Sequence, residues 1–315
     1  MNVIVEREKG LLQLEQRIAD LRKHSADQPV DLSNEITALE QKYGQIQREI
    51  FGSMSPWQRV NMARHPKRPI GSDYIAALDQ FDELHGDRHF RDDVAVIAGF
   101  AKLKGRRVLV VAQEKGRDFK DKVRHNFGSA SPEGYRKVTR LVKLAGHLGL
   151  PVVTFVDTSG ADPGLGSEER AQSEAIATSL ATFADIPVPV VATVIGEGGS
   201  GGALALALAD HVIMLQHSVY SVASPEGAAA ILWGDASKAD EAASRLRLTS
   251  DDLREFGIID EVIPEPLGGA HRDAAGTIAA VMTAVDAALG KLKLTPVHTL
   301  LDRRYAKFRR IGTVA

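Results

Sequence analysis

The residues of this chain best suited to chemistry form one glycine-rich segment, Gly196-Glu-Gly-Gly-Ser-Gly-Gly202. It follows an apolar run typical of a buried strand and precedes an Ala/Leu-rich run typical of a helix. Five glycines in seven residues are costly to order, because glycine loses the most backbone entropy on folding. An ordinary connection has no use for them, whereas a backbone with positive φ or in contact with a ligand does.

The predicted chemistry of this segment is the binding of negative charge. At a helix N-terminus the free N–H groups point outward and the helix dipole favours an anion. The segment from Gly196 to Gly202 therefore predicts a strand-to-helix turn that holds a phosphate, a carboxylate or an enolate oxygen. The alternative without chemistry is tight packing of a small-residue helix against the sheet.

Four functions remain open for this turn from the residues alone. A nucleotide-phosphate loop is disfavoured, because the chain contains no GxxxxGK[ST] motif. A serine hydrolase is possible, because Gly198-Gly-Ser-Gly-Gly202 matches GxSxG, with Asp235 and His271 as candidate partners of Ser200. An oxyanion hole made of backbone N–H groups uses the glycines directly and needs no protein nucleophile. A non-catalytic binding module is the fourth.

The strands and helices expected to position this turn predict an α/β fold. Apolar runs typical of strands occur at 94–97, 108–111, 152–156, 188–195, 211–215, 219–222 and 258–263, and helical patterns at 131–149, 167–183, 200–209, 225–232, 237–246, 251–255 and 273–289. Strands apolar on both faces that alternate with helices predict a largely parallel sheet with right-handed crossovers.

Residues 1–60 carry a different pattern from the rest of the chain. Leu11, Leu14, Ile18 and Leu21 recur at helical spacing, and after a polar break a second apolar stripe runs from Leu32 to Ile50. This predicts an antiparallel helical hairpin, which either packs on its own core or grips a partner chain. We expect a core domain over 61–290 and a basic tail over 291–315, whose segment Arg303–Arg310 is expected to form a solvated terminal helix in preference to a docking element.

Composition narrows the class of protein further. The 315 residues carry a formal charge of −2 and no cysteine, so disulfides, thiolate metal sites and a cysteine nucleophile are excluded, and nucleic acid is not an expected partner. No signal peptide is recognisable, and the longest apolar run, Ala203–Ala209, is too short to span a bilayer. We expect a cytoplasmic protein with no membrane partner and no bound metal.

Three further features have open interpretations. Glu197 inside the turn is either a site carboxylate or a side chain that caps backbone N–H groups. A basic stretch from Lys102 to Arg124 is either a solvated face or a contact for CoA phosphates or an acidic carrier domain. Ser224 is predicted to be an N-cap, followed by Pro225 as the first helical residue.

Longer motifs resemble the alpha subunits of bacterial acetyl-CoA carboxylase carboxyltransferases. These motifs run in order along nearly the whole chain: Ala63-Arg-His-Pro66, Asn126-Phe-Gly128, Pro132-Glu-Gly-Tyr-Arg-Lys137, Phe155-Val-Asp-Thr-Ser-Gly-Ala-Asp-Pro-Gly164, Glu168–Ala177, Val194–Leu204, Tyr220–Gly227 and Ile263–Arg272. The resemblance implies a crotonase-like spiral of ββα units. It also implies transfer of the carboxyl group from carboxybiotin to acetyl-CoA, which yields malonyl-CoA for fatty-acid synthesis.

The same resemblance implies partners and site residues. The expected partners are a beta subunit in an alpha2beta2 assembly, the biotin carboxyl carrier protein and biotin carboxylase, with no covalently bound cofactor. The N–H groups of Gly201 and Gly202 are expected to stabilise the biotin enolate as CO₂ leaves. The remaining substrate-binding residues that the resemblance implies are Gly198, Gly199, Ser200, Gly160, Ala161, Gly164, Ala223 and Ser224.

Two positions differ from the usual pattern of that family. Ser159 stands where the family typically has proline, and Asp162 where it has an aromatic residue. Both belong to the loop after the strand that begins at Val152. A carboxylate at Asp162 is unfavourable beside a carboxylated substrate unless it is paired or directed outward.

Overall fold

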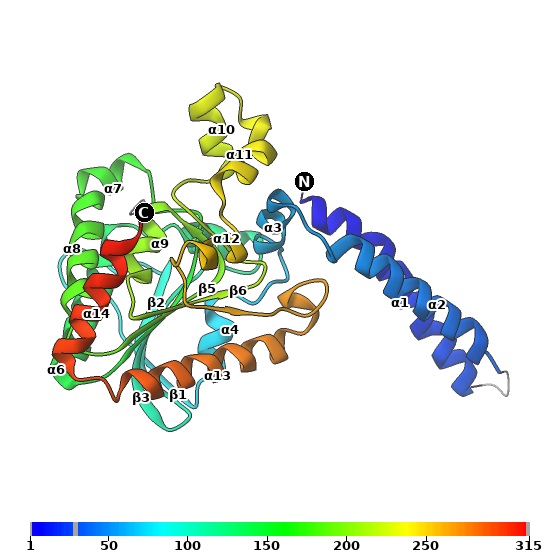
Figure 1. Ribbon diagram of the computed structural model, residues 1–315, viewed down its shortest axis with the longest axis horizontal. Coiled ribbons are helices and arrows are strands. Elements are labelled where there is room, and N and C mark those ends of the chain that lie inside the picture. Colours follow the sequence, from blue (N-terminus) through cyan, green and yellow to red (C-terminus); the bar gives the residue numbers. More distant parts are fainter. Residues whose placement is uncertain (1, 28–30, 313–315) are drawn as a thin grey trace.

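The centre of the molecule is an eight-stranded sheet (Figure 1), in a computed structural model that describes residues 2–27 and 31–312. The strand order is β1-β2-β3-β4-β5-β6-β8, and β7 pairs with the C-terminal end of β5. Pairing is antiparallel from β1 to β3 and parallel from β3 onward. The strands are β1 Gln80–Glu83, β2 Val96–Leu103, β3 Arg106–Gln113, β4 Val152–Thr158, β5 Val190–Gly199, β6 His211–Leu215, β7 Val219–Ser221 and β8 Glu261–Ile263.

Helices cover both faces of this sheet, as the continuous apolar strands predict. Every residue of β4 is buried, and its side chains alternate between two cores. Val152 and Val156 face the core under helices α6, α8 and α9, whereas Val153 and Phe155 face the core under α4 and α13. The helices that form these layers are α4 Gly71–Ala76, α6 Pro132–Leu148, α8 Gln172–Asp185, α9 Ser200–Ala207 and α13 Ala274–Leu292. The predicted α/β class is confirmed.

The predicted helical hairpin is present at the N-terminus. Helices α1 (Val3–Asp27) and α2 (Ser33–Phe51) pack side by side and extend away from the sheet as an arm, before α3 (Pro56–Ala63) enters the body (Figure 1). At the base of the arm, its own small core contains Ile4, Leu11, Phe51, Met54 and Met62. The arm therefore has a core of its own near the body.

Several element boundaries differ from those expected. The helix predicted over 167–183 is two helices, α7 (Leu165–Glu169) and α8, because Ala171 takes a left-handed φ of 63° between them. The strand predicted over 94–97 lies slightly later in the chain, as β2 (Val96–Leu103). The C-terminal part of the body contains α10 (Pro225–Trp233), η2 (Ala236–Lys238), α11 (Ala239–Leu246), α12 (Ser250–Glu255) and η3 (Ala270–Arg272). Helices α10 and α11 together project from the body (Figure 1).

The C-terminal helix α14 (Val297–Arg310) is anchored, so its expected description as a solvated helix is wrong. Arg304 is almost fully buried, pairs with Asp210 at 2.7 Å, and donates to the carbonyls of Phe183, Ile186 and Val188. The carbonyl of Phe183 lies in the last turn of α8 and those of Ile186 and Val188 follow it, so none of them has a partner inside that helix. A buried guanidinium with five donors therefore fixes α14 on the body.

One described helix, α13, is long and apolar enough to cross a membrane by composition alone. In this structure its Val281, Val285 and Leu289 are buried against the sheet, together with Val153 and Ile213. Its apolar character is therefore explained by the core that it covers.

Candidate functional site

The glycine-rich segment is mostly strand. Strand β5 continues through Gly199, paired with β7 at Glu197, Gly198 and Gly199, and α9 begins at the next residue. The expected turn over 196–202 is therefore wrong in extent, because the reversal occurs at the single step from Gly199 to Ser200. Ser200 accordingly has a left-handed φ of 51° and is exposed.

Close packing accounts for four of the five glycines. A Cβ would lie 2.4 Å from Asp157 Oδ1 at Gly196, 2.8 Å from the ring of Tyr220 at Gly198, 2.1 Å from the carbonyl oxygen of Ser159 at Gly199 and 2.4 Å from the amide nitrogen of Ala161 at Gly202. Contacts this short do not occur for real side chains. Close packing thus explains these four positions, but three of them are strand residues that meet neighbouring strands or the loop after β4, and not the helix packed on the sheet that the sequence left open.

Gly201 is different from its neighbours. A Cβ at Gly201 would meet only Ile176, at an ordinary contact distance of 3.6 Å, so nothing within the chain requires glycine there. Gly201 and Gly202 lie in the first turn of α9, whose N–H groups have no partner inside the helix. Within the described residues, the structure also records no other acceptor for these two N–H groups. A free backbone surface at Gly201 is what a bound anion needs.

The peptide after Gly202, which continues the first turn of α9, is held in a fixed orientation. The carbonyl of Gly202 accepts a hydrogen bond of 2.9 Å from Gln113 Nε2, and Tyr135 Oη lies 3.5 Å from the same oxygen. Gln113 is fully buried and its Oε1 accepts from the amide of Asp157, which ties α9 to the end of β4. Donors fixed in advance toward a developing charge are the basis of an oxyanion hole, because they need no reorganisation during the reaction.

The loop after β4 supplies the floor beneath this helix start. Gly160 (φ 151°) and Ala161 lie against Gly199 and Gly202, as the short distances above show. Gly164 lies further along, as the N-cap of α7, and accepts there from Ser167 and Glu168. The structure thus brings Gly160 and Ala161, but not Gly164, into contact with the glycine segment.

Asp162 is paired, although its type departs from the family pattern. Its carboxylate accepts from the amide of Gly164 at 3.2 Å and from the hydroxyl of Ser167 at 2.5 Å. A carboxylate that accepts hydrogen bonds near a helix N-terminus is locally stabilised. The structure therefore engages Asp162 locally in the loop before α7, whose N-cap is Gly164.

The other predicted binding residues follow β7. Ser221 pairs with Gly199 across the sheet, so the chain leaves the glycine segment toward Ala223 and Ser224. Ser224 caps α10 by accepting from the amide of Gly227, and Pro225 is the first helical residue, as predicted. Ala223 packs on the small apolar cluster between α10 and α11.

A network of buried charges adjoins the glycine segment and was missed by the sequence analysis. Glu197 pairs with Arg64 at 2.6 Å and with Lys115 at 3.2 Å, and Lys115 pairs with Asp157 at 2.7 Å. Arg64 also reaches Glu226 of α10 at 2.5 Å. We call Arg64, Lys115, Asp157 and Glu197 the charge network. Its members are far apart in sequence, so no local spacing marks them.

The charge network fixes the ionisation of Glu197. Burial alone would raise the pKa of Glu197, but Lys115 and Arg64 outweigh it and hold that pKa at about 2. The carboxylates of Asp157 and Glu197 raise the pKa of Lys115 in spite of its burial. The amide of Glu197 also donates to Asp157 at 2.8 Å, so the network joins the ends of β4 and β5. Glu197 is thus an ion-paired carboxylate, and among the described residues no backbone amide is recorded as donating to its side chain.

A cavity of about 240 Å³ opens beside the charge network. It lies between α3, the segment after β3 and the end of β4. Its lining residues include Arg64, Lys115, Lys122, Phe127, Ser159 and Glu197. The cavity places space for a small group next to the strand that carries the glycines.

The serine hydrolase arrangement is not assembled. Asp235 bonds to Ser237 and caps η2, and His271 bonds to Glu8 at the base of the arm. Neither makes a recorded hydrogen bond with Ser200 in the described part of the chain. The segment does not form a nucleotide-phosphate turn either, because Gly196 and Gly198 lie within β5.

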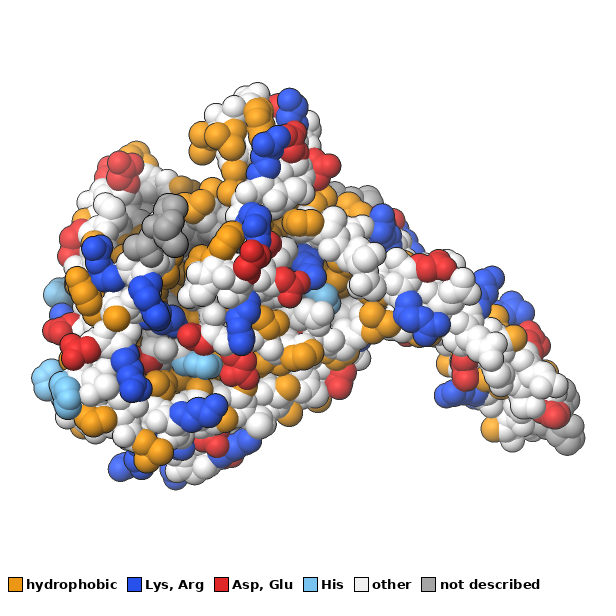
Figure 2. Space-filling model, viewed as in Figure 1, with side chains coloured by type: hydrophobic (Ala, Val, Ile, Leu, Met, Phe, Trp, Pro, Cys, Tyr) orange, Lys and Arg blue, Asp and Glu red, His pale blue; other side chains and the backbone are white. Residues whose placement is uncertain are grey.

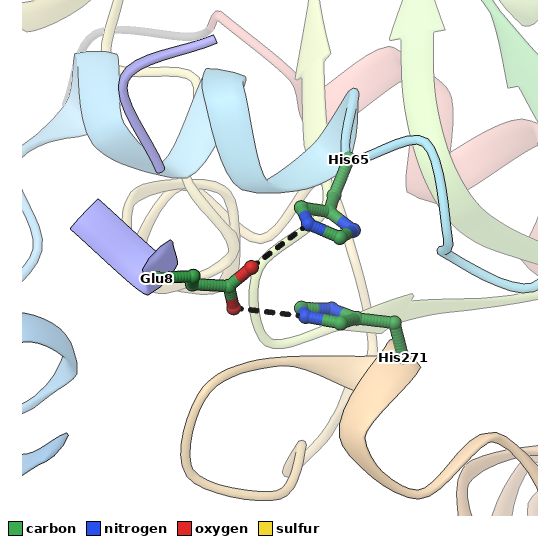
Figure 3. Close-up of side chains that lie close together, drawn as sticks. All are labelled: Glu8, His65 and His271. Atoms are coloured by element: carbon green, nitrogen blue, oxygen red, sulfur yellow. Dashed lines mark hydrogen bonds and ion pairs between the residues drawn. The ribbon is translucent and has the colours of Figure 1, made fainter. Parts of the chain in front are cut away.

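His271 belongs instead to a buried cluster with Glu8 and His65 (Figure 3). Glu8 Oε2 lies 3.0 Å from His65 Nε2, and Glu8 Oε1 lies 2.9 Å from His271 Nε2. The two rings are stacked with centroids 3.7 Å apart. We call this cluster the arm clasp, because it joins α1 to the residues that follow α3 and to η3.

The arm clasp has the residue types of a metal site but not the hydrogen-bonding pattern. His65 Nδ1 accepts from the amide of Lys67 at 3.2 Å, so the proton of the neutral ring is on Nε2, which faces Glu8. A nitrogen that carries this proton has no lone pair for a metal. The arrangement fits a carboxylate that accepts two N–H donors.

Comparison with solved structures finds this fold in other proteins. The chain is similar to transcarboxylase 12S, with a TM-score of 0.57, 20% identity, and coverage of 70% of this chain and 41% of that chain. It is also similar to the Pseudomonas malonate decarboxylase MdcD-MdcE heterodimer, with a TM-score of 0.56, 18% identity, and coverage of 68% and 88%. The expected crotonase-like fold is confirmed.

Comparison with protein sequences identifies the family of this chain. Residues 4–312 match the family described as acetyl co-enzyme A carboxylase carboxyltransferase-like. The chain is 51% identical over 313 residues to the acetyl-coenzyme A carboxylase carboxyl transferase subunit alpha of Carboxydothermus hydrogenoformans, covering 99% of this chain and 97% of the relative. It is 48% identical to the corresponding subunit of Erythrobacter litoralis, covering 99% and 100%. The chain belongs to this family of carboxyltransferase alpha subunits.

Proposed function

We propose that the chain is the alpha half of a carboxyltransferase that moves the carboxyl group of carboxybiotin to acetyl-CoA and so forms malonyl-CoA for fatty-acid synthesis. The observation that carries this proposal is the pair of N–H groups of Gly201 and Gly202, which have no recorded acceptor among the described residues and lie in a helical turn that Gln113 and Tyr135 fix through the carbonyl of Gly202. Family membership over nearly the whole chain supports the same reaction.

In the proposed reaction the bond between the biotin N1′ and the carboxyl carbon breaks, and its electron pair moves onto the ureido group. The ureido oxygen gains negative charge, which the N–H groups of Gly201 and Gly202 would stabilise. The biotin nitrogen then takes a proton from the methyl group of acetyl-CoA, and the resulting carbanion attacks the released CO₂. No protein side chain serves as a base in this scheme, which fits the absence of a histidine–carboxylate pair at Ser200 among the described residues.

The proposed site is completed by a beta subunit, which would hold the acetyl-CoA enolate. An exposed apolar surface supports a permanent partner close to the glycines. Val222, Ile231 and Leu232 are 77%, 81% and 64% exposed on and beside α10, and Figure 2 shows hydrophobic side chains on this projecting unit. Large exposed apolar patches mark interaction sites in proteins.

The complete proposed assembly is an alpha2beta2 carboxyltransferase in the cytoplasm, which works with biotin carboxylase and the biotin carboxyl carrier protein. Carboxybiotin arrives as a substrate on the carrier, and acetyl-CoA is the second substrate. We propose no covalently bound cofactor and no metal for this chain. Gly198, Gly199, Ser200, Gly160, Ala161, Ala223 and Ser224 would surround the biotin, and Gly164 would act more remotely through α7.

The proposal is tested by malonyl-CoA decarboxylation in the presence of free biotin, with this chain alone and with the matching beta subunit. Activity is expected only in the mixture. Gly201→Val should reduce it at least about 100-fold, because the valine side chain would occupy the open space at Gly201 and keep the oxyanion away from the N–H groups, and the loss of one oxyanion contact costs about 10²–10³ in rate. The complex should still form, since the position has room within the chain.

Gly10→Val is the matched control, because it makes the same change on α1, where a Cβ would meet nothing within 4 Å. It should keep the activity of the mixture. Activity of the alpha chain alone would show that the shared site is wrong. An inactive but assembled wild-type mixture would refute the carboxyltransferase proposal.

A further inference from the structure

Helix α5 (Phe119–Arg124) is an unusual element of this fold, because none of its residues is buried. Its apolar side chains face solvent: Phe119 is 77% exposed, Val123 is 54% exposed, and Phe127 just after the helix is 47% exposed. Phe119 and Phe127 contact each other edge to face, with ring centroids 6.5 Å apart. We call Phe119, Lys120, Val123, Arg124 and Phe127 the α5 face.

The α5 face carries positive charge that the chain does not neutralise. Among the described residues, no ion pair is recorded for Lys120, Lys122 or Arg124. The two nearby carboxylates are engaged locally. Asp118 accepts from the amide of Asp121, and Asp121 accepts from the amide of Arg117 and pairs with His125. An unpaired positive patch attracts an acidic partner.

The α5 face lies at the mouth of the cavity beside the charge network. Lys122 and Phe127 line that cavity together with Ser159 and Glu197. Gly128, the next residue, lies so close to β4 that a Cβ would be 2.9 Å from the carbonyl oxygen of Asp157. A macromolecule that delivers a group into this cavity must therefore touch the α5 face.

The fold separates the α5 face from the rest of the basic stretch between Lys102 and Arg124. Lys102, at the end of β2, and Arg107, at the start of β3, lie next to the β2–β3 turn, whereas α5 follows the end of β3. Eight strand residues separate the two ends, or roughly 25 Å. The stretch from Lys102 to Arg124 is thus two surfaces, and only the second adjoins the site.

We infer that the α5 face docks the carrier domain that brings biotin to this site, through an acidic surface with apolar residues on that domain. This inference rests on the proposed function. The cores of permanent interfaces are depleted in charge, whereas charged rims accelerate short-lived encounters. The uncharged patch of Val222, Ile231 and Leu232 therefore suits the permanent beta subunit, and the charged α5 face suits a carrier that binds and leaves.

The test compares two forms of the same substrate with the assembled alpha–beta complex. Malonyl-CoA decarboxylation is measured with biotinylated carrier domain and, separately, with free biotin, which needs no docking surface. The variant combines Phe119→Ser with Lys120→Glu, two exposed positions outside the cavity lining. We expect KM for the carrier to rise about tenfold or more, with kcat and the free-biotin reaction unchanged.

Salt provides a second readout of the same contact. Raising ionic strength should increase KM for the carrier with the wild-type complex and less so with the variant, because the steering charge has been removed. Lys102→Glu is the matched control, since it makes the same charge change at the other end of β3. It should leave both reactions unchanged.

Other results would overturn the inference. If the variant lost the same share of decarboxylation activity with the carrier and with free biotin, or failed to assemble, the α5 face would belong to the beta interface or to the site. No change with either substrate would show that the carrier does not touch it. Competition by a single-stranded RNA that is lost in the variant, with no change in KM for the carrier, would identify a nucleic-acid surface instead. An assembled wild-type complex that is inactive with free biotin would refute the proposed function itself.

Discussion

Two adjacent residues, Arg64 and His65, lead into two buried polar clusters of different character. Arg64 joins the charge network, in which two cations face Glu197 and Asp157 beside the glycine segment. His65 joins the arm clasp, in which Glu8 accepts from two histidines (Figure 3). Consecutive residues of the chain therefore belong to the polar core next to the site and to the polar core that holds the arm.

The difference lies in how each cluster satisfies its buried carboxylates. The charge network uses full opposite charges, and removal of one cation leaves carboxylates buried without compensation. In the arm clasp, burial on its own would raise the pKa of Glu8, but the hydrogen bonds from His271 and His65 hold that pKa at about 2. Burial lowers the pKa of His271, so this ring is neutral near pH 7. The clasp thus depends on hydrogen bonds from neutral rings and should be the weaker of the two.

The largest expected effect comes from breaking the charge network at Lys115. Lys115→Met keeps the length of the side chain but leaves Asp157 without its ion pair and Glu197 with Arg64 alone. We expect the free energy of unfolding to fall by about 3–5 kcal/mol, the usual cost of removing one partner from a buried pair. Urea unfolding followed by circular dichroism measures this change.

Lys102→Met is the control for that substitution, because Lys102 is exposed and has no recorded ion pair within the described chain. It should change the free energy of unfolding by less than about 0.5 kcal/mol. A Lys115→Met variant as stable as this control would contradict the comparison, since the network would then contribute nothing beyond a surface charge.

The two clusters also mark the limit of prediction from sequence. Periodicity located β4, α6, α9 and the arm, because apolar spacing reflects which face of an element is buried. The glycines and the N-cap at Ser224 were recognisable for the same local reason. The pairs Arg64–Glu197 and Glu8–His271 are 133 and 263 residues apart in sequence, so only tertiary folding brings them together.

The glycine segment shows the same limit at closer range. The sequence predicted one anion-binding turn, whereas the structure assigns four glycines to packing and leaves Gly201 open. The neighbours responsible, Asp157, Ser159, Ala161 and Tyr220, come from other strands and loops, so a list of glycines could not rank them. The solvated C-terminal helix was wrong for a related reason, because the partners of Arg304 lie on α8, on the segment that follows it, and at Asp210.

A smaller effect is expected from Glu8→Gln in the arm clasp. The glutamine carbonyl can accept from one histidine, but its NH₂ group meets the N–H of the other. If His271 changes tautomer to accept, its Nδ1, which is buried without a partner, must carry the proton. The free energy of opening the arm should fall by about 1–3 kcal/mol, the cost of one unsatisfied buried group.

Hydrogen exchange of the amides in α1, followed by mass spectrometry, measures this opening. Glu6→Gln is the control on the same helix, because Glu6 is partly exposed and its recorded ion pair in the described part of the chain is with Lys9. It should change α1 exchange by less than about 0.5 kcal/mol. Equal effects of the two substitutions would show that the clasp does not hold the arm.

The smallest effect concerns acid. Because the folded pKa of His271 lies below its unfolded value of about 6.5, the unfolded chain binds more protons as pH falls through this window. The contribution of the clasp is therefore present above about pH 6.5 and declines below it, by about 1.4 kcal/mol per unit of pKa difference. Exchange in α1 should accelerate between pH 7 and pH 5, after correction for the intrinsic rate. Strands β4 and β5 should stay protected, since Glu197 keeps its charge down to about pH 2.

Two histidine variants test which group causes this acid response. His271→Gln retains an N–H donor for Glu8 but does not titrate, so it should flatten the pH dependence of exchange in α1. His24→Gln, at an exposed histidine of α1, should not. An unchanged slope in His271→Gln would assign the acid response of the arm to another group.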